Sequence, residues 1–120
     1  MARLLVVDDD EGDRVVLRTI LERANHQVWV AKDGDEALTQ FQGKDIDVVI
    51  TDLQMRNVHG LELIGILRDL TPRPGIIAVS GTGETQLDMA RMLGASVTLT
   101  KPIRPDQLLD AVTTAIGQKG

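Results

Sequence analysis

In Arg3-Leu4-Leu5-Val6-Val7-Asp8-Asp9-Asp10, a short hydrophobic run ends in three consecutive acids. The arrangement recurs twice: Asp47-Val48-Val49-Ile50-Thr51 ends in Asp52, and Ser96-Val97-Thr98-Leu99-Thr100 ends in Lys101-Pro102. Parallel α/β sheets bind ligands at the carboxyl ends of their strands. If these runs are neighbouring parallel strands, we expect the carboxylates and the lysine ammonium to meet in one pocket.

The length and composition suit one compact domain. The chain has 120 residues, 42% of them hydrophobic and 26% charged, and we expect residues 1–120 to form a single domain. The net charge of −5 argues against direct binding of nucleic acid or anionic membranes, which need clustered positive charge. The chain contains no Cys, which excludes thiolate catalysis and zinc–thiolate sites. Hydrophobic stretches are too short to span a membrane and no signal peptide is evident, so we expect a cytoplasmic protein.

Short β-branched runs alternate with segments of helical periodicity. The predicted strands are Leu4–Val7, Val28–Ala31, Val48–Ile50, Ile76–Val79 and Val97–Leu99. The apolar stripes of the predicted helices lie within residues 16–24, 36–41, 61–68, 87–93 and 108–116, with Val16 and Leu17 on the inward side of the first. This pattern predicts an α/β fold of five βα units with right-handed crossovers. It is a doubly wound, five-stranded parallel sheet with helices on both faces.

The acids after the first strand are candidate cation ligands. A helix N-cap needs only one side chain, and we assign that role, or solvent exposure, to Asp10. Asp8 and Asp9 would repel each other unless a hard cation with oxygen ligands neutralises them. We therefore interpret Asp8 and Asp9 as cation ligands, and the alternative is that they only cap the following helix.

Asp52 is a candidate nucleophile. It ends a buried Val-Val-Ile strand, where a carboxylate is poorly solvated and needs a partner such as Lys101 or a divalent ion. A carboxylate oxygen can attack phosphorus and form an acyl phosphate. The alternative is an Asp that only begins the next loop through an Asx-turn.

Ser80 and Lys101 complete the group of strand-end residues. The Ser80 hydroxyl could donate to a phosphoryl oxygen, and Gly81 leaves room for that group, although Ser-Gly is also an ordinary turn. The Lys101 ammonium could bridge Asp52 and a phosphoryl group. Pro102 ends the strand, and a cis Lys101–Pro102 bond is compatible with the sequence.

Other notable side chains are interpreted as structural. His26 and His59 lack the spacing of metal ligands and are expected at the surface. Trp29 is expected at a sheet edge or under a helix. Met89 and Met92 lie near one face of the fourth helix, where methionines more often fill a core than form a binding patch.

Asp8-Asp9, Asp52, Ser80 and Lys101-Pro102, in this order and spacing, resemble the receiver domain of two-component response regulators. The resemblance covers essentially all 120 residues. It implies a flavodoxin-like (βα)5 fold with strand order 2-1-3-4-5. It also implies a phosphoacceptor signalling switch, which is not a turnover enzyme.

The resemblance assigns a role to each of these residues. Asp52 accepts a phosphoryl group from a sensor histidine kinase, a phosphotransfer protein or a small donor such as acetyl phosphate. Ser80 then holds the phosphoryl group and Lys101 pairs with it. Mg2+ is the implied cofactor, and its implied ligands are Asp9 directly, Asp8 largely through water, Asp52, and the backbone carbonyl of Gln54.

Several positions depart from the family pattern. Thr98 stands where many receivers have an aromatic residue, so coupling of Ser80 to a rotating ring is not expected. Arg56 replaces a common proline in the loop after Asp52. Gln54 and Thr82 occupy positions that influence hydrolysis of the acyl phosphate in the family.

The same pattern leaves two other functions as alternatives. Phosphatases of the haloacid-dehalogenase type also use a strand-end Asp and Mg2+, but they place a second Asp two residues later, where this chain has Gln54. A flavodoxin-like cofactor binder would need a loop that cradles phosphate after the first strand. Three acids at that position would repel phosphate.

The sequence also suggests a surface for partners. A homodimer or partner is expected on the face of the fourth helix, fifth strand and fifth helix, represented by Met89, Met92, Thr98 and Gln107. The domain could act alone or be the receiver of a longer regulator.

Overall fold

The computed structural model describes residues 1–55, 59–81 and 84–117, so Arg56 and Thr82 lie outside the described residues. Five parallel strands form one sheet in the order β2-β1-β3-β4-β5. The strands are β1 (Arg3–Val7), β2 (Gln27–Ala31), β3 (Val48–Asp52), β4 (Gly75–Ser80) and β5 (Val97–Thr100). This confirms the predicted parallel sheet and its strand order.

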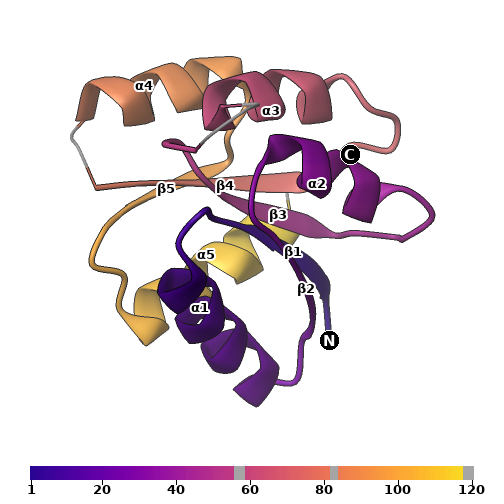
Figure 1. Cartoon of the computed structure of the whole chain (residues 1–120), viewed down its shortest axis with the longest axis vertical. Coiled ribbons are helices and arrows are strands. Elements are labelled where there is room, and N and C mark those ends of the chain that lie inside the picture. Colours follow the sequence, from indigo (N-terminus) through magenta and orange to yellow (C-terminus); the bar gives the residue numbers. More distant parts are fainter. Residues whose placement is uncertain (56–58, 82–83, 118–120) are drawn as a thin grey trace.

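Five helices cover both faces of the sheet. They are α1 (Glu11–Arg23), α2 (Gly34–Phe41), α3 (Gly60–Arg68), α4 (Glu84–Leu93) and α5 (Pro105–Ile116). α1 and α5 lie on one face, whereas α2, α3 and α4 lie on the other (Figure 1). The architecture is the predicted flavodoxin-like (βα)5 fold.

The strands form because their residues are apolar on both faces. Every residue of β3 and β4 is buried, as expected for central strands of a covered parallel sheet. Alternation along β1 directs Leu4 and Val6 into the core under α1 and α5, and Leu5 into the core under α2, α3 and α4. Each fully buried Leu or Ile stabilises the fold by about 1.5–3 kcal/mol.

The strand register aligns the functional ends. Val7 pairs with Thr51, which places Asp8 and Asp52 beside each other at the carboxyl edge of the sheet. On the other side of β3, Asp52 pairs with Val79 of β4. Ser80, the next residue of β4, pairs with Thr100 of β5. A hydrogen bond from Asp8 N to the Ala31 carbonyl, at 3.1 Å, extends the β1–β2 ladder past the end of β1.

Two acids fix the starts of α1 and α2. Asp10 is the N-cap of α1, and its Oδ1 accepts from Asp13 N at 3.2 Å, which confirms the predicted cap. Asp33 caps α2 and accepts from Glu36 N at 2.8 Å. This cap starts α2 at Gly34, two residues before the predicted stretch.

Three apolar residues predicted to face inward are exposed. Val16 is 55% exposed, Met89 47% and Met92 82%, so their assignment to the core was wrong. α1 buries only Leu17 and Leu21, and α4 packs through residues including Leu87 and Ala90. The apolar stripe of α1 is therefore narrower than the sequence suggested and leaves Val16 outside, and the two methionines lie outside the stripe of α4.

Trp29 and the two histidines lie largely where the sequence predicts. Trp29 lies on β2, an edge strand, with the Arg3 guanidinium 4.8 Å from its ring centroid. His59 is exposed, whereas His26 is half-buried and its Nδ1 accepts from Ala2 N at 3.0 Å. The expectation of a surface position was therefore only partly right for His26.

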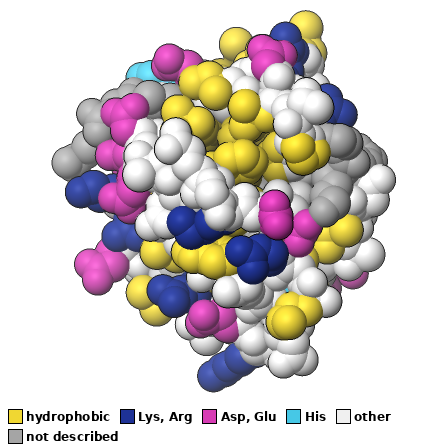
Figure 2. All heavy atoms as spheres, turned by 90° about the vertical axis from the view of Figure 1, so that its right-hand side faces the viewer, with side chains coloured by type: hydrophobic (Ala, Val, Ile, Leu, Met, Phe, Trp, Pro, Cys, Tyr) yellow, Lys and Arg dark blue, Asp and Glu magenta, His cyan; other side chains and the backbone are white. Residues whose placement is uncertain are grey.

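Hydrophobic side chains gather in the middle of the face that lies at the right of Figure 1 (Figure 2). A surface hollow between the end of α2 and the start of β4 is lined by residues that include Phe41, Ile46 and Leu70.

Within the described ranges, no helix has the length and apolar character needed to cross a membrane.

Candidate functional site

The predicted site residues lie at the carboxyl ends of the strands. Asp8 follows β1, Asp52 ends β3, Ser80 ends β4 and Lys101 follows β5. Asp8 is 1% exposed, Asp52 7% and Ser80 0%, so these polar groups are removed from water where the strands meet. The sheet thus brings together side chains that are far apart in the sequence.

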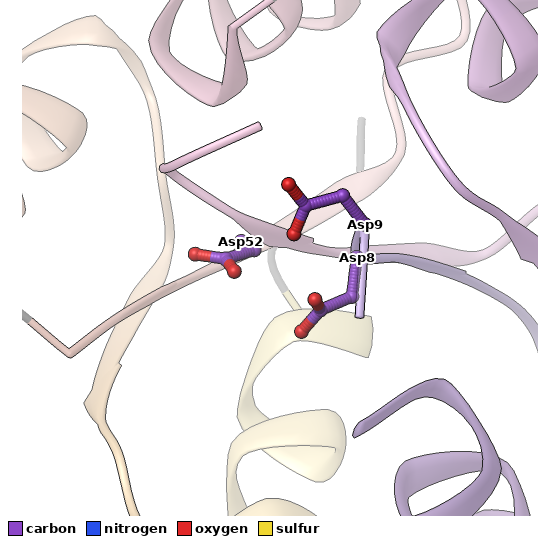
Figure 3. A group of neighbouring side chains, drawn as sticks. All are labelled: Asp8, Asp9 and Asp52. Carbon is purple, nitrogen blue, oxygen red and sulfur yellow. The ribbon is translucent and has the colours of Figure 1, made fainter. Parts of the chain in front are cut away.

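Asp8, Asp9 and Asp52 form a compact acidic group. Each offers a carboxylate oxygen, and these oxygens lie within 4.8 Å of one another (Figure 3). Burial raises the pKa of Asp8. A hydrogen bond from Asp10 N opposes this effect, while the charge of Asp52 raises the pKa further. A cation among these carboxylates would reduce their mutual repulsion and offset the cost of removing them from water.

The donor set fits Mg2+, which prefers hard oxygen ligands and is usually held by one or two carboxylates together with water. Asp52 has one further restraint: its Oδ1 accepts from Gln54 N at 3.1 Å. This bond places Gln54 next to the acidic group. The use of the Gln54 carbonyl as a ligand stays a prediction.

Lys101 binds three carboxylates at once. Its Nζ lies 3.1 Å from Asp8 Oδ2, 3.1 Å from Asp52 Oδ2 and 2.9 Å from Asp13 Oδ2. Burial lowers the pKa of Lys101, but the hydrogen bonds to Asp13, Asp52 and Asp8 outweigh this effect and raise the pKa above its ordinary value. The ammonium therefore stays charged at neutral pH.

Asp13 is the site residue that sequence reasoning missed. It lies in the first turn of α1, three residues after the N-cap Asp10, and an acid there is ordinarily explained by the helix dipole. The next residue also reaches the site, since Arg14 Nη1 donates to the Asp8 carbonyl at 2.7 Å. The run of acids in residues 8–13 was the available signal.

Backbone contacts hold Ser80 and Lys101 together. Lys101 N donates to the Ser80 carbonyl at 3.0 Å, which continues the β4–β5 ladder. The Lys101–Pro102 peptide bond is cis, in agreement with the sequence. Ser80 is fully buried at the end of β4, with Gly81 exposed directly after it.

Gly60 lets α3 pack directly on the backbone of the site. A Cβ at this position would lie 2.3 Å from the Asp52 carbonyl oxygen and 2.5 Å from Leu53 Cα. Gly60 N also donates to the Leu53 carbonyl at 3.3 Å. The start of α3 therefore restrains the backbone that carries Asp52.

In this group, a buried carboxylate lies between an ammonium and two further carboxylates. Asp52 offers a carboxylate that could act as a nucleophile, Lys101 an ammonium, and the acidic group a place for a divalent cation. The position of the acid/base of a haloacid-dehalogenase phosphatase is occupied by Gln54, which cannot transfer a proton in that way. That alternative is not favoured.

Comparison with known proteins agrees with this geometry. The family model described as "Response regulator receiver domain" matches residues 4–113. The sensory/regulatory protein RpfC of Xanthomonas campestris pv. campestris (strain 8004) is 30% identical over 115 residues, covering 92% of this chain. The alignment spans only 16% of RpfC, so the chain matches a small part of that relative.

Solved structures show the same fold. A response regulator receiver domain protein from Clostridium thermocellum superposes with a TM-score of 0.90 at 30% identity, covering 98% of this chain and 96% of that one. A response regulator from Burkholderia pseudomallei superposes with a TM-score of 0.87 at 31% identity, covering 98% of this chain and 70% of that one. The latter structure contains a phosphorylated aspartic acid and a calcium ion. The chain belongs to the response regulator receiver domain family, whose members are phosphoacceptor switches of two-component signalling.

Proposed function

We propose that Asp52 is the phosphoacceptor of this receiver. The observation that supports it best is the contact of Asp52 Oδ2 with Lys101 Nζ at 3.1 Å, in a buried position beside Asp8 and Asp9. A carboxylate between an ammonium and an acidic cation site can approach a dianionic phosphoryl group, which would otherwise be repelled. Phosphorylated aspartate in the Burkholderia relative supports the same assignment.

The transfer step follows from these positions. An oxygen of Asp52 attacks the phosphorus of a phosphohistidine, the P–N bond breaks, and the imidazole nitrogen leaves with the electron pair. With acetyl phosphate the P–O bond breaks and acetate leaves. Lys101 donates to a phosphoryl oxygen as negative charge shifts there, and the buried Ser80 hydroxyl donates to the transferred group afterwards.

Asp8, Asp9, Asp52 and the Gln54 carbonyl would hold Mg2+. The bound ion would supply charge that neutralises the phosphoryl oxygens during transfer. The same acidic group explains why such an ion would be needed, since Asp8 and Asp52 are both buried and close to each other.

The partners follow from the class of protein. Curated relatives include a sensor kinase/phosphatase and a transcriptional regulatory protein, so the proposed donor is a sensor histidine kinase or a phosphotransfer protein. We expect residues 1–120 to act as one receiver domain in the cytoplasm, without direct nucleic acid binding and without turnover of an external substrate. A homodimer on the α4–β5–α5 face is also proposed, supported by the exposure of Met89 and Met92.

Intact mass spectrometry tests the acceptor. The purified chain is incubated with acetyl phosphate and Mg2+, beside Asp52→Asn and beside a sample with excess chelator. We expect one phosphoryl adduct on the wild-type chain with Mg2+ only. Substantial adduct on Asp52→Asn would contradict the assignment, and catalytic hydrolysis of phosphate esters would revive the phosphatase alternative.

The roles of Lys101 and of the dimer face need separate tests. Lys101→Ala should fold and take up the phosphoryl group more slowly, because the charge that offsets the phosphoryl oxygens is lost. Uptake at the wild-type rate would remove Lys101 from the mechanism. Light scattering with and without beryllofluoride tests the dimer, and an unchanged monomer would contradict it.

A further inference from the structure

Asp13 closes a ring of interactions around the site. Asp8 Oδ1 accepts from Asp10 N at 2.9 Å, and Asp10 Oδ1 accepts from Asp13 N at 3.2 Å. Asp13 Oδ2 then binds Lys101 Nζ at 2.9 Å, and the same ammonium returns to Asp8 Oδ2 at 3.1 Å. The first turn of α1 is therefore fixed relative to the lysine.

Gly12 leaves room for this ring. A Cβ added there would lie 3.2 Å from Asp10 Oδ1, the oxygen that accepts from Asp13 N. The small residue lets Asp10 approach the helix closely, and Asp13 is held on the side that faces Lys101. The contact between Asp13 and Lys101 thus depends on the close backbone approach at Gly12 as well as on the Asp13 side chain.

The three partners of Lys101 differ in what else they do. An ammonium has three N–H donors, and Asp8, Asp13 and Asp52 occupy them. Asp8 and Asp52 belong to the acidic group that fits a cation, whereas Asp13 does not. When Asp52 becomes an acyl phosphate, its carboxyl group becomes neutral and the negative charge lies on the phosphoryl oxygens, so the Lys101 N–H that faced the carboxylate turns to a phosphoryl oxygen.

We infer that Asp13 is a positioning residue that anchors the Lys101 ammonium while the site holds a cation and a phosphoryl group. This inference rests on the proposed role of Asp52. Asp13 is the partner whose full charge remains available to Lys101 in that state. It acts through Lys101 and does not touch the transferred group.

Asp13 could also have the opposite effect and weaken the binding of an anion at the site. Its carboxylate is an additional negative charge near an anion, and it could compete with the phosphoryl oxygens for the Lys101 donors. In that case removal of Asp13 would tighten anion binding. The anchoring role predicts weaker binding, so the sign of the change separates the two effects.

Beryllofluoride with Mg2+ is the probe, because it mimics a phosphoryl group on a carboxylate without transfer chemistry. Its affinity is measured by calorimetry for wild type, Asp13→Ala, Asp13→Asn and Glu11→Ala. Glu11 is an exposed acid in the same turn of α1, so its removal is a matched control for net charge. Circular dichroism verifies that each variant is folded.

We expect Asp13→Ala to weaken beryllofluoride binding about threefold to tenfold, the effect of losing a partly exposed, charge-assisted hydrogen bond. Asp13→Asn, which keeps an oxygen acceptor, should recover part of the loss, and Glu11→Ala should stay within about twofold of wild type. Unchanged or tighter binding by Asp13→Ala would overturn the positioning role of Asp13 and leave the proposed role of Asp52 intact. Failure of the wild-type chain to bind the probe would remove the proposed acceptor site and the inference with it.

Discussion

Substitution of Gly60 by alanine tests how α3 restrains the site. The added Cβ would lie 2.3 Å from the Asp52 carbonyl oxygen and 2.5 Å from Leu53 Cα, distances that real Cβ atoms essentially never show. Both neighbours are backbone atoms at the end of β3, so no flexible side chain can move aside. Either the start of α3 or the backbone of Asp52 must shift.

The expected cost follows from overpacking. Extra methyl groups in a packed interior cost about 1–3 kcal/mol, and contact with backbone on two sides favours the upper end. In a domain of this size, a loss of about 3 kcal/mol lowers the melting temperature by about 10 °C. Because Asp52 is one of the displaced residues, Gly60→Ala should also bind Mg2+ more weakly.

Thermal unfolding followed by circular dichroism measures this, and Gly65→Ala is the matched control. Gly65 lies in the same helix, and a Cβ there meets no atom within 4 Å. Alanine restricts the unfolded chain more than glycine does, so this control should gain about 0.5–1 kcal/mol. If Gly60→Ala unfolds at the wild-type temperature and binds Mg2+ with wild-type affinity, α3 does not restrain the backbone of Asp52.

Three further predictions concern the helix cap at Asp33, the protonation of Asp8 and the charge of Lys101. Asp33→Ala removes the acceptor that holds Glu36 N at 2.8 Å and should lower the free energy of unfolding by about 1 kcal/mol in a urea titration; an unchanged midpoint would argue against the cap. The pKa of Asp8 is raised above 3.8, so its folded form takes up a proton before the unfolded form does, and protons compete with Mg2+ at a higher pH than for an ordinary carboxyl. Calorimetric Mg2+ affinity should therefore fall as the pH is lowered from neutral, with a flatter profile for Asp8→Asn, and equal profiles would contradict this. Lys101→Ala leaves buried carboxylates without their ammonium and should lower the free energy of unfolding by about 3 kcal/mol in Mg2+-free buffer. Mg2+ should raise the melting temperature of this variant more than that of wild type, and equal shifts would count against a cation site at these carboxylates.

Much of the fold and of the site could be predicted because both depend on where strands end. Hydrophobic runs locate the strands, and right-handed crossovers bring their carboxyl ends to one edge. Asp8, Asp52, Ser80 and Lys101 are all fixed by that rule, so their convergence follows from the chain order of apolar runs and polar ends.

Contacts made by helices were harder to predict. Asp13 reaches Lys101 only because α1 is rotated so that its first turn faces the end of β5. The inward position predicted for Val16 is wrong because periodicity locates an apolar stripe but not its width, and the core position of Met92 was expected only from the usual behaviour of methionine. The close approach of Gly60 to β3 has no local signature, since it depends on the distance between two packed elements.

Mapping the phosphorylated residue tests most directly whether Asp52 is the phosphoacceptor. The chain is phosphorylated with acetyl phosphate and Mg2+, reduced with borohydride, which converts an acyl phosphate to an alcohol, and sequenced by tandem mass spectrometry. We expect the reduced side chain at position 52 and at no other acid. Reduction at Asp8, Asp9 or Asp13 instead would contradict the assignment of Asp52 as the phosphoacceptor.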